Sequence, residues 1–233
     1  MPDGIVVSPH HGNKLLVILA IILAIVVITV LIGIGQVAFQ RIGFNSLEYI
    51  LILVGTLAGS AVNIPVGQLT STEPLMDAGG VTVFGLYYKI PRLLYRQTST
   101  VIAVNLGGAV IPVIVSIYLL ATHLGLFAGA LLGIFVTSVL VHLMARKVRG
   151  VGIVTPALLP PIVAAVMAYL LAPHSPAIVA YVSGTLGALI GADLSNLRGI
   201  VKLGAPMASI GGAGTMDGVF LTGIIAVLLV PLL

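Results

Sequence analysis

The feature that most limits how this chain can fold is a series of long apolar segments. The first, Leu15–Ala38, contains no charged residue and exceeds the roughly 20 residues that a helix needs to cross a bilayer. Hydrophobic residues make up 59% of the 233 residues and charged residues only 7%, so a soluble domain would expose more apolar surface than it could cover. We therefore expect a multi-pass protein of the cell membrane, with the lipid bilayer as a partner.

The lengths of the apolar segments predict about seven transmembrane helices. The expected fold is an all-α, polytopic membrane helix bundle that forms one integral membrane domain over residues 1–233. No linker composition divides the chain. The expected spans are Leu15–Ala38, Leu47–Val62, Thr100–Ala121, Leu124–Ala145, Pro161–Leu171, Ala177–Leu197 and Asp217 to the C-terminus.

The basic residues predict the orientation of these spans. If the spans alternate in direction, nine of the ten Lys and Arg fall on one side of the membrane, and only Arg41 falls on the other. The positive-inside rule then places the N-terminus in the cytoplasm and the C-terminus outside. Because the basic residues flank membrane spans, we expect no nucleic-acid partner.

The loop between the second and third spans, residues 63–99, has a different composition. Its segment VTVFGLYY is rich in β-branched and aromatic residues and is bounded by Gly and Pro, which predicts a short β-hairpin at the cytoplasmic face. An interfacial loop with aromatic anchors is the alternative. Glu73 and Asp77 in the same loop are expected in a solvated turn.

Two of the six acidic residues, Asp193 and Asp217, lie in apolar surroundings. An ionisable group at membrane depth is costly and is by default a functional candidate. Asp193 is near the cytoplasmic end of the sixth expected span and Asp217 is at the start of the seventh. Consecutive spans are usually neighbours, so the two carboxyl groups are expected at similar depth.

Two carboxyl groups held close in a medium of low dielectric share a proton. The ionised group can then act as a general base on water while the protonated group acts as a general acid, which is the chemistry of peptide-bond hydrolysis. The chain has no cysteine and no histidines at metal-ligand spacing near the aspartates, so we expect no metal and no cofactor. Alternatively, Asp217 caps a helix and Asp193 forms a structural salt bridge.

The residues around the aspartates resemble the GxGD-type intramembrane aspartyl proteases, the presenilins and signal peptide peptidases. Asp193 is similar to the first aspartate of that family, and Asp217 in GAGTMDG to the second. TPALLPP contains a Pro-Ala-Leu sequence similar to the family's third motif. The resemblance implies an endopeptidase that cleaves transmembrane proteins or peptides near the cytoplasmic face with Asp193 and Asp217 as catalytic residues. The residues expected to bind substrate are Pro156, Ala157, Leu158, Gly212 and Gly214.

The sequence departs from that family at three points. Met216 stands directly before Asp217 where the motif has glycine, and Ala192 stands where the family has tyrosine before its first aspartate. The Pro-Ala-Leu sequence precedes both aspartates, so the relationship implied is permuted or convergent. A proton- or cation-coupled transporter or channel using the same acids, and a non-catalytic membrane scaffold, remain as alternatives. The oligomeric state stays open, and we expect a prokaryotic source.

Overall fold

We describe a computed structural model of the chain, which covers residues 12–83, 86–148, 152–197, 199, 206–212 and 218–233, with the backbone alone for residues 12–15 and 71–98. Most of these residues are helical, and the helices follow the expected apolar segments. The α-helices are α1 (Gly12–Arg41), α2 (Ser46–Ser60), α3 (Ile111–Thr122), α4 (Phe127–Met144), α5 (Leu159–Leu171), α6 (Pro176–Ala188) and α8 (Gly218–Leu229). Short turns extend four of them: the π turns η1 (Leu106–Val110) and η3 (Leu189–Asp193), and the 3₁₀ turns η2 (Leu124–Leu126), η4 (Leu194–Asn196) and η5 (Val230–Leu232).

Three of the described helices are long and apolar enough to cross a membrane: Leu16–Arg41, Leu124–Met144 and Pro176–Asn196. Four shorter apolar helices, of 10–17 residues, accompany them: Ser46–Ser60, Leu106–Thr122, Leu159–Leu171 and Gly218–Leu232. Large apolar side chains cover much of the outer surface, with Leu23 62% exposed and Leu170 66% exposed. Such a surface is stable in lipid and not in water, so the predicted helical membrane protein is confirmed in this coarse form.

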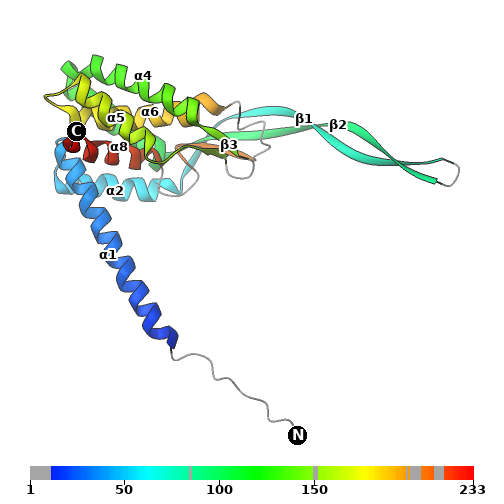
Figure 1. Cartoon of the computed structure of the whole chain (residues 1–233), viewed down its shortest axis with the longest axis horizontal. Coiled ribbons are helices and arrows are strands. Elements are labelled where there is room, and N and C mark those ends of the chain that lie inside the picture. Colours follow the sequence, from blue (N-terminus) through cyan, green and yellow to red (C-terminus); the bar gives the residue numbers. More distant parts are fainter. Residues whose placement is uncertain (1–11, 84–85, 149–151, 198, 200–205, 213–217) are drawn as a thin grey trace, which may run out of the picture.

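Helix α6 forms the centre of the bundle, between α4, α5 and α8 (Figure 1). Its small residues allow this close packing. A Cβ atom at Gly187 would lie 2.6 Å from Cβ of Thr137 on α4, and one at Gly184 would lie 3.3 Å from Cβ of Ala226 on α8. Lipid supplies no hydrophobic force between helices, so membrane helices associate through contacts of this kind.

An aromatic cluster joins α1 to the bundle at one end. Phe39 is fully buried, and its ring lies 5.2 Å from Tyr49, 5.7 Å from Tyr181 and 6.1 Å from Phe220. The rest of α1 diverges from the other helices, and its side chains from residue 16 to residue 34 are exposed (Figure 1). α1 is therefore anchored at its C-terminal end.

A long β-hairpin replaces the short one that the sequence predicts. β1 (Asn63–Val83) and β2 (Leu86–Asn105) pair antiparallel along their whole length and project beyond the helices (Figure 1). The expected start of the third span at Thr100 is wrong, because residues 100–105 complete β2 and the helix begins at Leu106. The solvated turn expected at Glu73 and Asp77 is also wrong, because both residues belong to β1.

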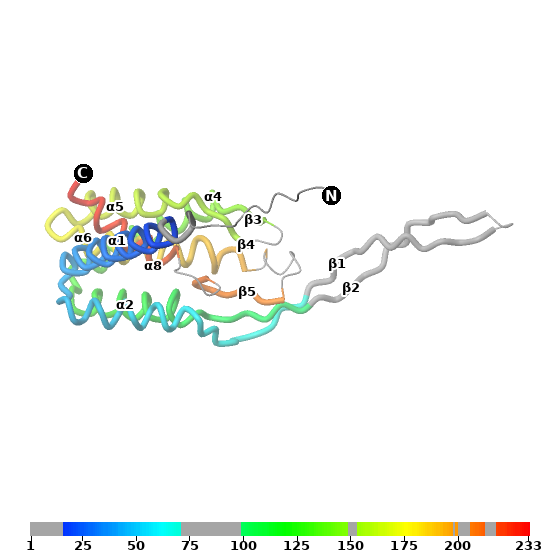
Figure 2. The backbone as a smooth tube through the Cα atoms, turned by 90° about the horizontal axis from the view of Figure 1, so that it is seen from below, coloured from blue at the N-terminus to red at the C-terminus, as the bar shows by residue number. Residues whose placement is uncertain are grey.

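The strands gather at one end of the bundle. β5 (Met207–Ile210) adds in parallel to the base of β2, and β3 (Arg146–Val148) pairs with β4 (Gly152–Val154) beside it. Figures 1 and 2 both show this end opposite the C-terminus and the turn between α1 and α2. Apart from α1, the helices thus run between a strand-rich end and an end made of short turns.

Candidate functional site

Asp193 is the last residue of the π turn η3, which continues α6 toward the strand-rich end. It lies three residues before the end of the candidate span Pro176–Asn196. π turns inside helices are frequent at functional sites because the extra residue displaces a side chain from the regular helical face. Asn196 donates from Nδ2 to the carbonyl oxygens of Gly191 (3.1 Å) and Ala192 (2.9 Å), which satisfies acceptors that the irregular turn leaves open.

The carboxyl group of Asp193 is held by the backbone that follows β5. The amide of Gly211 donates to its Oδ2 at 2.7 Å. Gly211 and Gly212 have φ of +82° and +93°, a conformation that side-chain-bearing residues rarely adopt. A Cβ atom on Gly211 would also lie 2.6 Å from the nitrogen of Ala109 in η1. Only glycine therefore fits at the position that presents this amide to Asp193.

A polar network fixes β5 and its glycine turn to the base of the hairpin. Asn105 is buried and donates from Nδ2 to the carbonyl oxygen of Ser60 (2.7 Å) and to Oδ1 of Asn63 (3.1 Å). Its own Oδ1 accepts from the amide of Gly108 (2.8 Å). The hydroxyl of Ser209 lies 2.6 Å from Oδ1 of Asn63 and also hydrogen-bonds the carbonyl oxygen of Gly212. These contacts connect the hairpin, η1 and the turn that holds Asp193.

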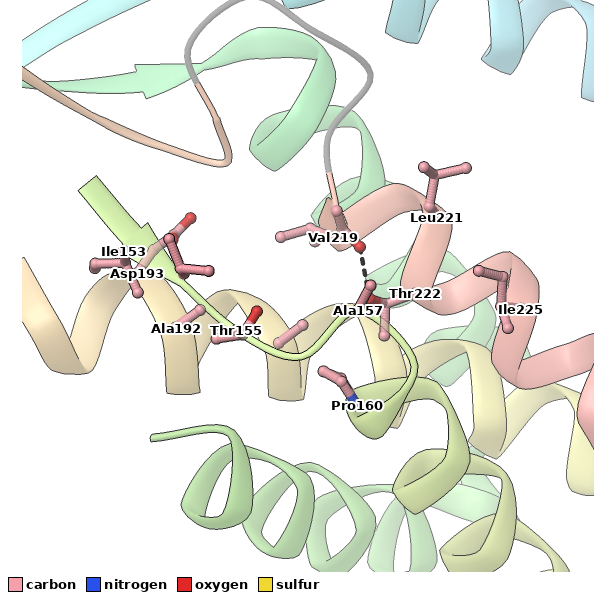
Figure 3. A pocket seen from close by; sticks show the side chains of 13 residues that line it. Ile153, Thr155, Ala157, Pro160, Ala192, Asp193, Val219, Leu221, Thr222 and Ile225 are labelled. Carbon is pink, nitrogen blue, oxygen red and sulfur yellow. Dashed lines mark hydrogen bonds between the residues drawn. The ribbon is translucent and has the colours of Figure 1, made fainter. Parts of the chain in front are cut away.

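Asp193 opens onto a cavity of about 380 Å³. Three segments surround it in Figure 3: the end of α6 with its π turn, the start of α8, and the stretch that leads from β4 into α5. Its walls are mostly apolar, with Asp193 and the hydroxyl-bearing Thr155 and Thr222 as the polar side chains. The lining residues are Ile153, Val154, Thr155, Ala157, Pro160, Ala188, Ala192, Asp193, Gly218, Val219, Leu221, Thr222 and Ile225.

The structure describes only one of the two candidate catalytic aspartates. Asp193 lines the cavity, whereas Asp217 lies outside the described residues. Gly218, which follows Asp217 directly in the chain, lines the same cavity as Asp193, at the start of α8.

The structure does not bring the five candidate substrate-binding residues together in one place. Ala157 lines the cavity together with Asp193, and Pro156 lines a neighbouring cavity. Leu158 is 62% exposed and lines neither, and Gly212 acts through its carbonyl oxygen as an acceptor for Ser209. Gly214 lies outside the described residues.

Sequence reasoning missed Gly211, Thr155 and Thr222. The Gly211–Gly212 pair is a turn signal that could have identified the amide donor, but it does not reveal which side chain the amide meets. Thr155 and Thr222 carry no signal beyond their nearness to Pro156 and Asp217. Thr222 donates to the carbonyl oxygen of Gly218 at 2.5 Å, so its hydroxyl is bonded back to the first turn of its own helix, α8, beside the cavity (Figure 3).

The residues that the structure describes contain no group of three or more His, Cys, Asp or Glu able to hold a metal ion. The described part of the site therefore offers a single carboxyl group oriented by an amide, in a largely apolar cavity at the end of a membrane helix. With a second carboxyl group this arrangement provides acid–base chemistry.

The fold and the site define a helical membrane protein with a long hairpin that projects beyond the helices and a carboxylate cavity at the hairpin end. The chain belongs to the family described as Protein of unknown function (DUF1614), whose model matches residues 57–229. The matched stretch contains the hairpin, the cavity and both aspartates, and it begins inside α2. No curated protein and no solved structure matches the chain.

Proposed function

We propose that the protein is an intramembrane aspartyl endopeptidase that uses Asp193 and Asp217 as an acid–base pair to cleave transmembrane segments. The observation that carries the proposal is the cavity. Asp193, Ala157 of the Pro-Ala-Leu sequence, and Gly218, the neighbour of Asp217, all line one space of about 380 Å³. Three sequence motifs, separated by tens of residues, thus contribute to a single site.

The proposed reaction needs only the two carboxyl groups and water. The ionised carboxylate takes a proton from water while the oxygen of that water attacks the carbonyl carbon of the peptide bond. The protonated carboxyl group gives its proton to the carbonyl oxygen. The tetrahedral intermediate then collapses: one of its hydroxyl groups returns a proton to the carboxylate that had acted as the acid, the C–N bond breaks, and the departing nitrogen receives the proton that the other carboxyl group took from water. The amide of Gly211 orients the Asp193 carboxyl group for these transfers.

A helical substrate must be unwound before its peptide bond can be hydrolysed. β5 is one of the two edge strands of the sheet, in the order β1-β2-β5, and it leads directly into the Gly211 turn. An extended peptide can add to such an edge through backbone hydrogen bonds. The closeness of this edge to Asp193 supports a peptide as the substrate.

The proposal includes seven crossings of the cell membrane, with the N-terminus and the strand-rich end in the cytoplasm. Arg146 and Lys147 belong to β3 at the strand-rich end, and Arg41 ends α1 at the opposite end. This distribution agrees with the positive-inside rule. Because Asp193 lies at the strand-rich end, cleavage would then take place near the cytoplasmic face. The four helices of 10–17 residues cross the membrane together with the residues that flank them, which supply the missing length.

The test uses the full-length protein in lipid vesicles with a tagged transmembrane reporter peptide. Asp193→Asn and Asp217→Asn should each lower the cleavage rate at least about 100-fold, as expected for loss of a general acid or base. Glu48→Gln is the matched control, because Glu48 lies in a helix-capping contact with Asn45 and glutamine can preserve it. Cleavage by either aspartate variant at the parental rate would rule out the dyad.

A coupled ion transporter is the second candidate, and one observation favours it. The hydroxyls of Thr56, Thr137 and Ser183 are buried and lack a hydrogen-bond partner among the described residues. Buried polar atoms of this kind are commonly satisfied by water, and a chain of waters is a path for protons. Proton-dependent uptake into protein-containing vesicles, absent in Asp193→Asn and accompanied by no reporter cleavage, would select this function instead.

A further inference from the structure

A second cavity, of about 510 Å³, lies next to the one that contains Asp193. It is formed where α4 ends and where the chain passes from β4 toward α5. Its lining residues are Leu143, Met144, Arg146, Val154, Thr155 and Pro156. Val154 and Thr155 also line the Asp193 cavity, so the two spaces share a wall.

The cavity lies at the end of a candidate membrane span. The candidate span Leu124–Met144 ends inside its lining, and Arg146 begins β3 two residues later. Leu143 is 72% exposed and faces the surroundings of the bundle. One side of the cavity is therefore apolar and continues a candidate membrane span, and the other side is cationic.

The cationic side has no acidic counterpart in the described structure. Arg146 and Lys147 are exposed, none of the six lining residues is acidic, and no ion pair joins either cation to another described residue. The Lys147 side chain lies over Gly199, where a Cβ atom would meet its Nζ at 2.5 Å. A positive site of this kind, set into an apolar surface, is complementary to a negatively charged amphiphile.

We propose that this cavity binds an anionic phospholipid. The phosphate accepts hydrogen bonds from the guanidinium group of Arg146, whose planar donors match phosphate oxygens, with Lys147 adding charge nearby. An acyl chain lies along Leu143, Met144 and Pro156. Basic pockets beside membrane helices recognise lipid headgroups through this combination. A free phosphate ion would leave the apolar wall unused, so lipid is the occupant that fits both sides.

The shared wall makes the lipid a regulator of the Asp193 cavity, a consequence that rests on the proposed proteolytic function. A bound headgroup holds β3, and β3 pairs with β4, whose last residue Val154 contacts both cavities. Ordering of this hairpin by lipid fixes one side of the space where a peptide would lie. Vesicles that contain anionic lipid should therefore support faster cleavage than vesicles of zwitterionic lipid alone.

Binding is tested on the full-length protein in detergent, with fluorescent phosphatidylglycerol and fluorescent phosphatidylcholine as probes. We expect phosphatidylglycerol to bind more tightly, and we expect Arg146→Gln to weaken its binding about five-fold or more. Arg41→Gln, at the opposite end of the bundle, is the matched control and should bind as the parent does. Inorganic phosphate should compete poorly. Equal binding of the two lipids, equal loss in both arginine variants, or full competition by inorganic phosphate would overturn the proposal.

A second measurement needs no substitution. A photoactivatable phosphatidylglycerol should label the parental protein within residues 143–146 or 154–156, identified by peptide mapping, and unlabelled phosphatidylglycerol should suppress this labelling. Labelling elsewhere only would contradict the proposal. Lipid binding does not require cleavage, so the Asp193→Asn variant should bind lipid as the parental protein does. If the protein proved not to be a protease, the expected lipid binding would stay the same.

Discussion

At the scale of single residues, the hydrogen bond between Gly211 and Asp193 is the contact that organises the site. A carboxyl group at the end of an apolar helix needs donors, and here the donor is a backbone amide 18 residues further along the chain. That amide is in place because Gly211 has a positive φ and packs directly against Ala109. Backbone geometry, instead of a basic side chain, therefore positions the acid.

Replacement of Gly211 by alanine should destabilise the protein through both strain and overlap. The positive φ costs about 1–2 kcal/mol for a residue with a Cβ atom, and the overlap with Ala109 adds roughly 1–3 kcal/mol. Gly43→Ala is the control, since Gly43 has a φ of +99° but no atom lies within 4 Å of the place that its Cβ atom would take. Unfolding in mixed detergent micelles should show Gly211→Ala to be the more destabilised of the two; equal losses would contradict the close contact.

The amide side chain of Asn105 should be equally sensitive. Asn105→Ala removes the partners of the Ser60 carbonyl oxygen and the Gly108 amide, and each group left unsatisfied costs about 1–3 kcal/mol. Thr29→Ala is the control, because the Thr29 hydroxyl bonds only the carbonyl oxygen of Ile25 within an exposed stretch of α1. The free energy of unfolding should fall in the first variant and stay nearly constant in the second.

At the scale of elements, the helices and the presence of a hairpin could be predicted from sequence, whereas the length and register of the hairpin could not. Apolar length determines the helices because the bilayer requires it, and the segment predicted from Leu124 to Ala145 forms a helix over Leu124–Met144. The hairpin contains Pro65, Pro74 and Pro91, residues that sequence rules associate with the ends of strands. Its register, which places Glu73 opposite Arg96, depends on pairing between distant residues that no local pattern reveals.

The same contrast explains the error at residues 100–105. The run Val101-Ile102-Ala103-Val104 is apolar and short, and such runs fit a helix or a buried strand equally well. These residues form a strand because they pair with β1 on one side and with β5 on the other. In the site, the position of Asp193 near the end of a helix could be predicted, whereas its partner Gly211 required knowledge of the turn after β5.

The attachment of α1 yields a prediction about elements. Phe39→Ala should cost about 3 kcal/mol, because it empties the centre of the aromatic cluster with Tyr49, Tyr181 and Phe220. Leu23→Ala should have almost no effect, since Leu23 is 62% exposed. Unfolding monitored by tyrosine fluorescence or circular dichroism in micelles measures both. Similar losses would mean that α1 packs along its whole length.

At the scale of the whole molecule, the strand-rich end and the turn end define two faces. α4 and α6 run between them and pack closely against each other, with Gly187 of α6 beside Thr137 of α4. Because the chain has no cysteine, single cysteines can report which face lies on which side of the membrane without a background signal.

A cysteine at Lys147 and a cysteine at Ser175 should be modified from opposite sides. Lys147 belongs to β3 and Ser175 precedes α6 at the other end of the bundle. With the strand-rich end in the cytoplasm, a membrane-impermeant thiol reagent applied to intact cells should label Ser175→Cys and should spare Lys147→Cys until the cells are lysed. The reverse pattern would invert the proposed orientation, and labelling of both in intact cells would contradict an odd number of crossings between them.

The parallel pairing of β2 with β5 has a consequence for biosynthesis. Val101 pairs with Met207, so β2 leaves the ribosome long before its partner exists. Helices α3 to α6 must be inserted while the base of the sheet still lacks this strand, and long-range pairing of this kind forms late. Gly211 reaches Asp193 only after that step. The Asp193 site should therefore stay incomplete in the nascent chain until the segment that contains β5 has been synthesised, and under the proposed proteolytic function this order of assembly spares the translocation machinery a protease formed too early.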